Sequence, residues 1–190
     1  TTKAAPVNSP NEVIDEQKLN QAKLHIGYTT GISIKDPDYF ALQVFNGLFG
    51  GLSHSKLFIN VREKNSLAYY GTSRFESHKS ILMVMSGIAS ENYEKATTII
   101  AEQLEEMKKG NFTEGEIDQT KLVIKNSLLE SMDTAYGIIE TLFNDQAAGN
   151  ERPIEDWFPE IEKVTKDEIV AVANKIKLHT TYFLKGQEGA

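Results

Sequence analysis

The chain has 190 residues, 40% of them hydrophobic and 25% charged, with 13 glycines and 5 prolines, which excludes a collagen-like, mucin-like or wholly disordered chain and indicates one globular domain. Twenty Lys and Arg against 27 Asp and Glu leave a net charge of -7, so we expect no nucleic acid and no membrane as partners. The absence of cysteine excludes disulfides and thiol catalysis, and it is consistent with the cytoplasmic location that we expect.

The first 19 residues are polar, contain two prolines and lack apolar periodicity. This pattern predicts a linker or approach segment over residues 1–19, a domain over 20–187 and a loose tail over 188–190. The first residue is not Met, and a strand-like run lies close to the last residue. We therefore expect the C-terminal part of a longer polypeptide.

The first half of the chain is predicted to alternate strands and helices. Period-two alternation or short apolar runs predict three strands, over 21–30, 67–75 and 80–89. The last of these is apolar on both faces, which favours a central position in the sheet. Asp36 and Pro37 offer an N-cap and a first helical position for a helix that ends at Gly50 and Gly51. A short helix over 53–62 follows it.

The second half is predicted to be helical until a closing strand. The predicted helices share apolar residues at helical spacing and cover 91–109, 113–131, 135–148, a short element around Trp157, and 165–176. Two of them begin with a capping-box pattern, Thr113 with Glu116 and Thr165 with Glu168. The closing strand covers 179–185. The class is therefore α+β, a two-layer ferredoxin-like domain whose mainly antiparallel sheet carries helices on one face.

Common catalytic motifs are absent from the sequence. The four histidines, His25, His54, His78 and His179, form neither HxxEH nor HExxH, so we expect no metal site in this chain. The two glycines at 50 and 51 lack the Lys-Ser/Thr of a P-loop, and Ser86 lacks the flanking glycines of a nucleophile elbow.

One stretch has a specific pattern. Residues 50–70 read GGLSHSKLFINVREKNSLAYY, a helix of GGxxxSKLFxxVRE type that runs directly into an SLAYY strand. Together with the QAKLHIGY strand and the closing YFLKG strand, this block resembles the C-terminal, non-metal half of the pitrilysin-like (M16, inverted HxxEH) zinc peptidases. That group includes the mitochondrial processing peptidase and its bacterial relatives.

The resemblance implies a divided active site. Zinc would lie on HxxEH in a homologous partner domain or subunit, while Arg62 and Tyr69 of this chain bind an extended peptide and Tyr69 stabilises the transition state. No metal and no cofactor would belong to this chain, which should not hydrolyse peptides alone. Homodimers or heterodimers fit this scheme. By the two-residue period of a strand, Tyr70 is expected to pack against the helices, and Met83, Met85 and Trp157 are expected in the core.

Two alternatives remain open on the sequence. Arg62 near a helix C-terminus is stabilised by the helix dipole with or without a substrate, and Tyr69 can be an ordinary sheet residue. The whole domain can then be a catalytically inactive M16-like scaffold or interaction domain. Asn65 and Ser66 stand where many relatives carry a glycine, so the loop between Arg62 and Tyr69 is expected to differ in shape.

Overall fold

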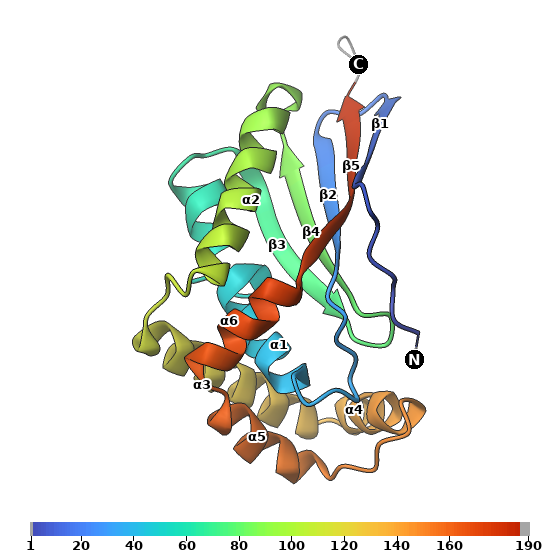
Figure 1. The fold of residues 1–190 in the computed structure, drawn as a ribbon, viewed down its shortest axis with the longest axis vertical. Helices are drawn as coiled ribbons and strands as arrows, with labels where there is room; N and C mark the ends of the chain where they lie inside the picture. Colours follow the sequence, from blue (N-terminus) through green and yellow to red (C-terminus); the bar gives the residue numbers. More distant parts are fainter. Residues whose placement is uncertain (1, 187–190) are drawn as a thin grey trace.

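Five strands form one sheet in the order β1-β5-β2-β4-β3 in the computed structural model, which describes residues 2–186 (Figure 1). The strands are β1 (Asn11–Gln17), β2 (Ala22–Thr29), β3 (Ala68–Glu76), β4 (Ile81–Ile88) and β5 (Lys177–Gly186). All neighbours pair antiparallel except β1 and β5, which are parallel. The predicted α+β class with a mainly antiparallel sheet is confirmed, and β4 has the predicted interior position between β2 and β3.

Helices cover one face of this sheet and extend beyond one end of it (Figure 1). The α-helices are α1 (Tyr39–Asn46), α2 (Tyr93–Lys108), α3 (Glu114–Met132), α4 (Ala135–Ala147), α5 (Trp157–Lys163) and α6 (Lys166–Lys175). The π-helical and 3-10 segments are η1 (Gly47–Gly51), η2 (Phe58–Glu63), η3 (Ser90–Asn92) and η4 (Ile154–Asp156). Both predicted capping boxes are confirmed: the Thr113 and Thr165 hydroxyls accept from the backbone N–H of the third helical residue.

Two expectations about the start of the chain and of α1 need correction. The linker predicted over residues 1–19 contains β1, whose seven residues are all exposed. An edge strand held by backbone hydrogen bonds to β5 needs no apolar face, so periodicity could not reveal it. Helix α1 begins at Tyr39, not after Asp36, because the Asp36 carboxylate accepts from the Ser33 N–H at 2.7 Å and the Ser33 hydroxyl at 2.6 Å. The predicted tail 188–190 lies outside the described residues.

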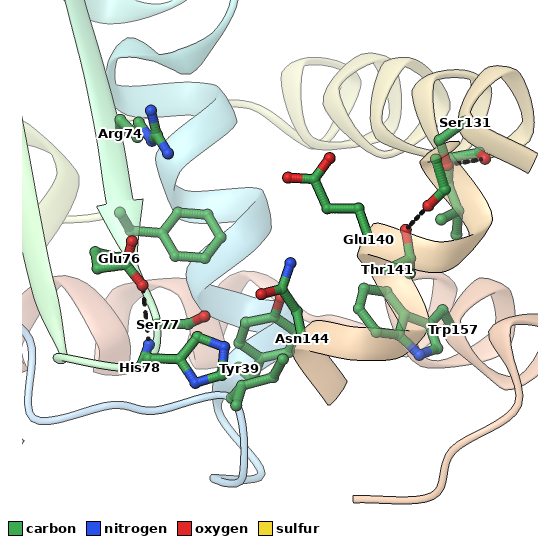
Figure 2. A pocket seen from close by; sticks show the side chains of 14 residues that line it. Tyr39, Arg74, Glu76, Ser77, His78, Ser131, Glu140, Thr141, Asn144 and Trp157 are labelled. Carbon is green, nitrogen blue, oxygen red and sulfur yellow. Dashed lines mark hydrogen bonds between the residues drawn. The ribbon is translucent and has the colours of Figure 1, made fainter. Parts of the chain in front are cut away.

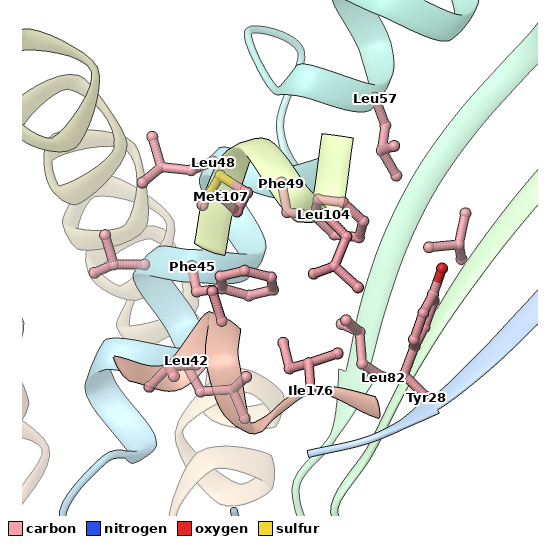
Figure 3. Packing of buried hydrophobic residues seen from close by; sticks show 14 of the residues in the cluster. Tyr28, Leu42, Phe45, Leu48, Phe49, Leu57, Leu82, Leu104, Met107 and Ile176 are labelled. Atoms are coloured by element: carbon pink, nitrogen blue, oxygen red, sulfur yellow. The ribbon is translucent and has the colours of Figure 1, made fainter. Parts of the chain in front are cut away.

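The core lies between the sheet and the helices α1, α2 and α6 (Figure 3). Its fully buried side chains come from every one of these layers and include Leu42, Phe45, Phe49, Leu82, Met107 and Ile176. Each buried side chain of this size contributes about 1.5–3 kcal/mol. Trp157 is buried as predicted. Met83 is exposed and Met85 half-buried on the face of β4 away from the helices, so the core prediction is wrong for these two methionines.

A partly buried ion pair links the end of α4 to the loop that follows it, and its arginine also contacts the loop before α1. Arg152 donates from Nη2 to the Asp145 carboxylate at 2.7 Å and to the Ile34 carbonyl at 2.9 Å. Asp145 is buried, and its second carboxylate oxygen accepts from the Arg152 N–H at 3.0 Å. The Arg152 guanidinium also lies 5.3 Å from the Phe40 ring centroid and 5.7 Å from that of Trp157. One side chain therefore links two loops and an aromatic cluster.

Arg152→Ala should lower the free energy of unfolding by about 3 kcal/mol, because it leaves the Asp145 carboxylate buried without a cation. Urea denaturation measures this change. The control is Lys163→Ala, which removes the exposed ion pair with Glu160 and should cost less than about 0.5 kcal/mol. Equal costs for the two variants would contradict the structural role of Arg152.

Ser80 combines two unfavourable features. Its φ of +57° lies in the left-handed region, and its buried hydroxyl has no hydrogen-bond partner among the described residues. Ser80→Gly removes both costs and should raise the free energy of unfolding by about 1 kcal/mol, after the entropy that glycine adds to the unfolded chain is subtracted. Ser80→Ala removes only the hydroxyl and should lie between. Thermal unfolding of the three proteins checks this order, and a glycine variant less stable than the alanine variant would refute it.

Candidate functional site

Strand β3 begins with a β-bulge at Tyr69. Ala68 pairs with Ile88, but the next paired residue is Tyr70, opposite Gly87, so β3 carries one extra residue here. The Tyr69 side chain is 69% exposed and that of Tyr70 is 38% exposed, whereas Ala68 is buried. The bulge therefore turns both tyrosines away from the helices.

Tyr70 lies over Gly87 on the face of the sheet that carries no helix. A Cβ placed on Gly87 would lie 2.5 Å from Cε1 of Tyr70, which shows how closely the ring approaches that backbone. The prediction that Tyr70 packs against the helices is therefore wrong. The period of two on which it rested is interrupted by the extra residue.

Arg62 comes from the π-helical segment η2. The Arg62 guanidinium carbon lies 4.7 Å from the centroid of the Phe58 ring, a cation–π contact that orients the guanidinium. No ion pair among the described residues involves Arg62. The contact between Phe58 and Arg62 was not predicted from the sequence. Phe58 precedes Arg62 by four residues on one helix, and this spacing could have indicated the contact.

Arg62 and Tyr69 line the same open pocket, of about 420 Å³. The other lining residues are Ser66, Leu67, Ala68, Ala89 and Asn92. The pocket lies at the end of the sheet where β3 begins and β4 ends, near the top of Figure 1. The structure thus brings together the two residues singled out from the sequence. The roles of these residues toward a substrate stay a prediction.

The turn between Arg62 and Tyr69 contains a left-handed residue. Ser66 has a φ of +51°, and its N–H donates to the Arg62 carbonyl at 3.1 Å. The Leu67 N–H donates to the Val61 carbonyl, also at 3.1 Å. Ser66 therefore adopts the conformation that glycine favours, and the turn accommodates it at a conformational cost.

Ser66→Gly should preserve or raise the free energy of unfolding, because glycine adopts this φ without strain. Ser66→Val should lower it by about 1–2 kcal/mol, because a β-branched side chain is strongly disfavoured at positive φ. Urea denaturation of both variants measures the difference. A valine variant as stable as the glycine variant would show that the turn does not need a positive φ.

No group of three or more His, Cys, Asp or Glu in residues 2–186 is arranged to hold a metal ion. Two of the histidines lie in surroundings that are not those of a metal ligand. The His54 ring pairs with the Thr120 hydroxyl at 2.9 Å, and burial, followed by the charge of Lys23, lowers the pKa of His25. The described residues thus do not fit a zinc ion. In the same part of the chain, no helix combines the length and apolar character needed to cross a membrane.

A second hollow, of about 480 Å³, lies near the other end of the sheet, between the β3–β4 turn and α4 (Figure 2). Arg74, Glu76 and His78 line its sheet side, and Glu140 and Asn144 line its helix side. Tyr39 and Trp157 belong to its aromatic wall. This hollow shares no residue with the Arg62–Tyr69 pocket, so it is no extension of that pocket.

The mainly antiparallel sheet and the shared pocket of Arg62 and Tyr69 agree with the resemblance carried by the residue 50–70 block. Residues 2–123 match the family model described as "Peptidase M16 inactive domain". The chain belongs to this M16 family, which confirms the resemblance carried by the residue 50–70 block.

Individual relatives agree with this assignment. The chain is 62% identical over 181 residues to the "Probable inactive metalloprotease YmfF" of Bacillus subtilis (strain 168), covering 95% of this chain and 42% of the relative. A solved structure of a conserved protein from Enterococcus faecalis V583 has 36% identity and a TM-score of 0.93, covering 100% of this chain and 45% of that one. The "Uncharacterized zinc protease YmxG" of Bacillus subtilis (strain 168) is 24% identical, with 85% of this chain and 40% of the relative covered. This chain spans less than half the length of each of these relatives.

Proposed function

We propose that this domain is a catalytically inactive M16-type interaction domain that binds a stretch of extended polypeptide at the Arg62–Tyr69 pocket without cleaving it. The observation that carries the proposal is the pairing of an exposed phenol with a guanidinium in one open pocket, on a domain whose described residues offer no metal-binding cluster. The printed name of the 62% identical relative, which calls that protein a probable inactive metalloprotease, supports the absence of hydrolysis.

The proposed binding uses backbone groups of the polypeptide. The planar Arg62 guanidinium, held against Phe58, donates hydrogen bonds to peptide carbonyl oxygens. The Tyr69 hydroxyl donates a second hydrogen bond from the other side of the turn. Contacts to carbonyl groups do not depend on the side chains of the bound segment, so this pocket accepts varied sequences in an extended conformation.

A second candidate function is completion of a zinc peptidase whose metal lies on a homologous HxxEH-bearing domain or subunit. The specific observation in its favour is that Tyr69 is exposed, with its hydroxyl available to a substrate held by another domain. The names of two more distant relatives, a zinc protease and the beta subunit of the yeast mitochondrial-processing peptidase, also support it. In this function Tyr69 stabilises the oxyanion that forms when a peptide bond is attacked.

Fluorescein-labelled, unfolded casein tests the proposed binding by fluorescence anisotropy. Arg62→Ala should weaken binding by about 10- to 100-fold, as expected for loss of a charged hydrogen-bond donor, and Tyr69→Phe by about 2- to 10-fold. Tyr70→Phe is the matched control, because Tyr70 is the neighbouring exposed tyrosine outside the pocket, and it should bind like the parent chain. Unchanged binding in Arg62→Ala would refute the proposed function.

The same labelled casein separates the two candidates. The chain is mixed with an HxxEH-bearing M16 protein, and release of labelled fragments is followed over time. An inactive interaction domain adds nothing to the cleavage by that protein. If the chain accelerates cleavage, and Tyr69→Phe but not Tyr70→Phe lowers that rate by about 10²- to 10³-fold, the second candidate replaces the first.

A further inference from the structure

Helix α4 presents apolar side chains to water. Tyr136, Ile139 and Phe143, at spacings of three and four residues, are 75%, 66% and 66% exposed, and Leu142 beside them is 43% exposed. We call these four residues the α4 stripe. The side of α4 that faces the domain carries instead the buried Asp145, which is paired with Arg152. The helix therefore has its more apolar face outward, opposite to the usual arrangement.

The neighbouring helix α3 also carries exposed apolar residues. Six of the twelve exposed large hydrophobic residues in the described part of the chain lie on α3 and α4, so exposure is concentrated in this pair of helices. The two on α3 are Leu122 and Leu129, seven residues apart on its exposed side, and α3 contacts α4. Monomeric proteins rarely expose a row of large apolar side chains on one helix, such as the α4 stripe, unless another surface covers it.

We propose that the α4 stripe is the contact surface for a companion domain, supplied by the part of the longer M16 polypeptides that this chain does not span. The Bacillus subtilis and Enterococcus faecalis relatives each carry more than half of their length outside the region that matches this chain. An interface between two domains of one polypeptide is smaller than an obligate dimer interface, about 600–1,500 Å², which suits a surface formed by one helix and its neighbour.

The place of α4 in the fold agrees with such an interface. α4 lies near the bottom of Figure 1, and the start of β3, which contributes Tyr69 to the pocket, lies near the top. A companion domain on the α4 stripe therefore leaves that pocket open. The inference does not depend on whether the pocket binds a polypeptide, because the two surfaces share no residue.

The charges beside the α4 stripe favour a partner of opposite charge over a second copy of this chain. Glu130 and Asp133 are exposed at the end of α3, next to the start of α4. A second copy carries the same carboxylates and a net charge of -7, so it lacks the complementary charge. A companion surface with an apolar centre and a basic rim is complementary to this arrangement.

Hydrogen exchange measured by mass spectrometry tests the proposal in a hybrid protein, in which this chain replaces the 181 matched residues of the full-length Bacillus subtilis relative. The backbone amides of α4 should exchange at least about tenfold more slowly in the hybrid than in the free 190-residue chain. Equal exchange in the two proteins overturns the proposal. If the hybrid does not unfold cooperatively, the natural relative and its matched region alone give the same comparison.

Substitutions assign the protection to the α4 stripe. Ile139→Asp combined with Phe143→Asp should return α4 to the exchange rates of the free chain. The matched control is Ile14→Asp, on the exposed edge strand β1, which should leave the protection unchanged. Protection that survives the double substitution overturns the proposal. Light scattering of the free chain gives a second contrary outcome. A free chain that is a dimer, and that Ile139→Asp converts to a monomer, also overturns the proposal. Casein binding that persists in Ile139→Asp shows that the Arg62–Tyr69 pocket is intact. Failure of the α4 proposal can therefore be distinguished from failure of the proposed function.

Discussion

A single extra residue in β3 determines that two tyrosine side chains of this domain are exposed at the start of the strand. In a regular strand, Tyr69 and Tyr70 would point to opposite faces, and one of them would enter the helix-covered core. The bulge at Tyr69 instead keeps Ala68 and Gly71 on the buried face while both tyrosines point away from it. The register of the rest of β3 against β4 is preserved, so the core remains packed and only the end of the strand is re-aimed.

The two ends of the domain have different kinds of structure. At the end with α4 and α5, the partly buried Asp145–Arg152 pair and a cluster of aromatic rings fix the connections between helices. At the other end, Arg62 and Tyr69 are held by a π-helical turn, a positive φ at Ser66 and one cation–π contact. Unusual backbone conformations are retained where the surrounding structure enforces them, and such sites are often functional. A positive φ is no difference between the two ends, because Ser80 in the β3–β4 turn also has one; the π-helical turn and the bulge at Tyr69 direct attention to the Arg62–Tyr69 pocket.

Sequence patterns predicted the elements that depend on apolar burial or on local capping. They failed for features that depend on backbone pairing between strands or on packing. The capping boxes at Thr113 and Thr165 and the interior position of β4 follow from the residues themselves. Strand β1 does not, because its exposed residues carry no apolar signal and only pairing with β5 makes it a strand. The orientation of Tyr70 also could not be predicted, because nothing in Leu-Ala-Tyr-Tyr indicates which residue is extra. Arg62 and Tyr69 were found through a family pattern, whereas Asn92 in the same pocket is contributed by a distant segment and had no signal.

The net charge of the whole domain and the local charge at the pocket have opposite signs, so they act on a ligand in different ways. A net charge of -7 produces a long-range field that attracts basic polypeptides, whereas the local cation at the pocket is Arg62. If the pocket binds a polypeptide as proposed, the field and the pocket select different features of that polypeptide: the field favours positive side chains, and the guanidinium favours carbonyl oxygens of the backbone. Since the field is screened within about 8 Å at physiological ionic strength, salt should weaken the approach of a basic segment more than its backbone contacts in the pocket. Under the proposed function, extended shape and overall charge are then enough to recognise a polypeptide, with no requirement for one particular sequence.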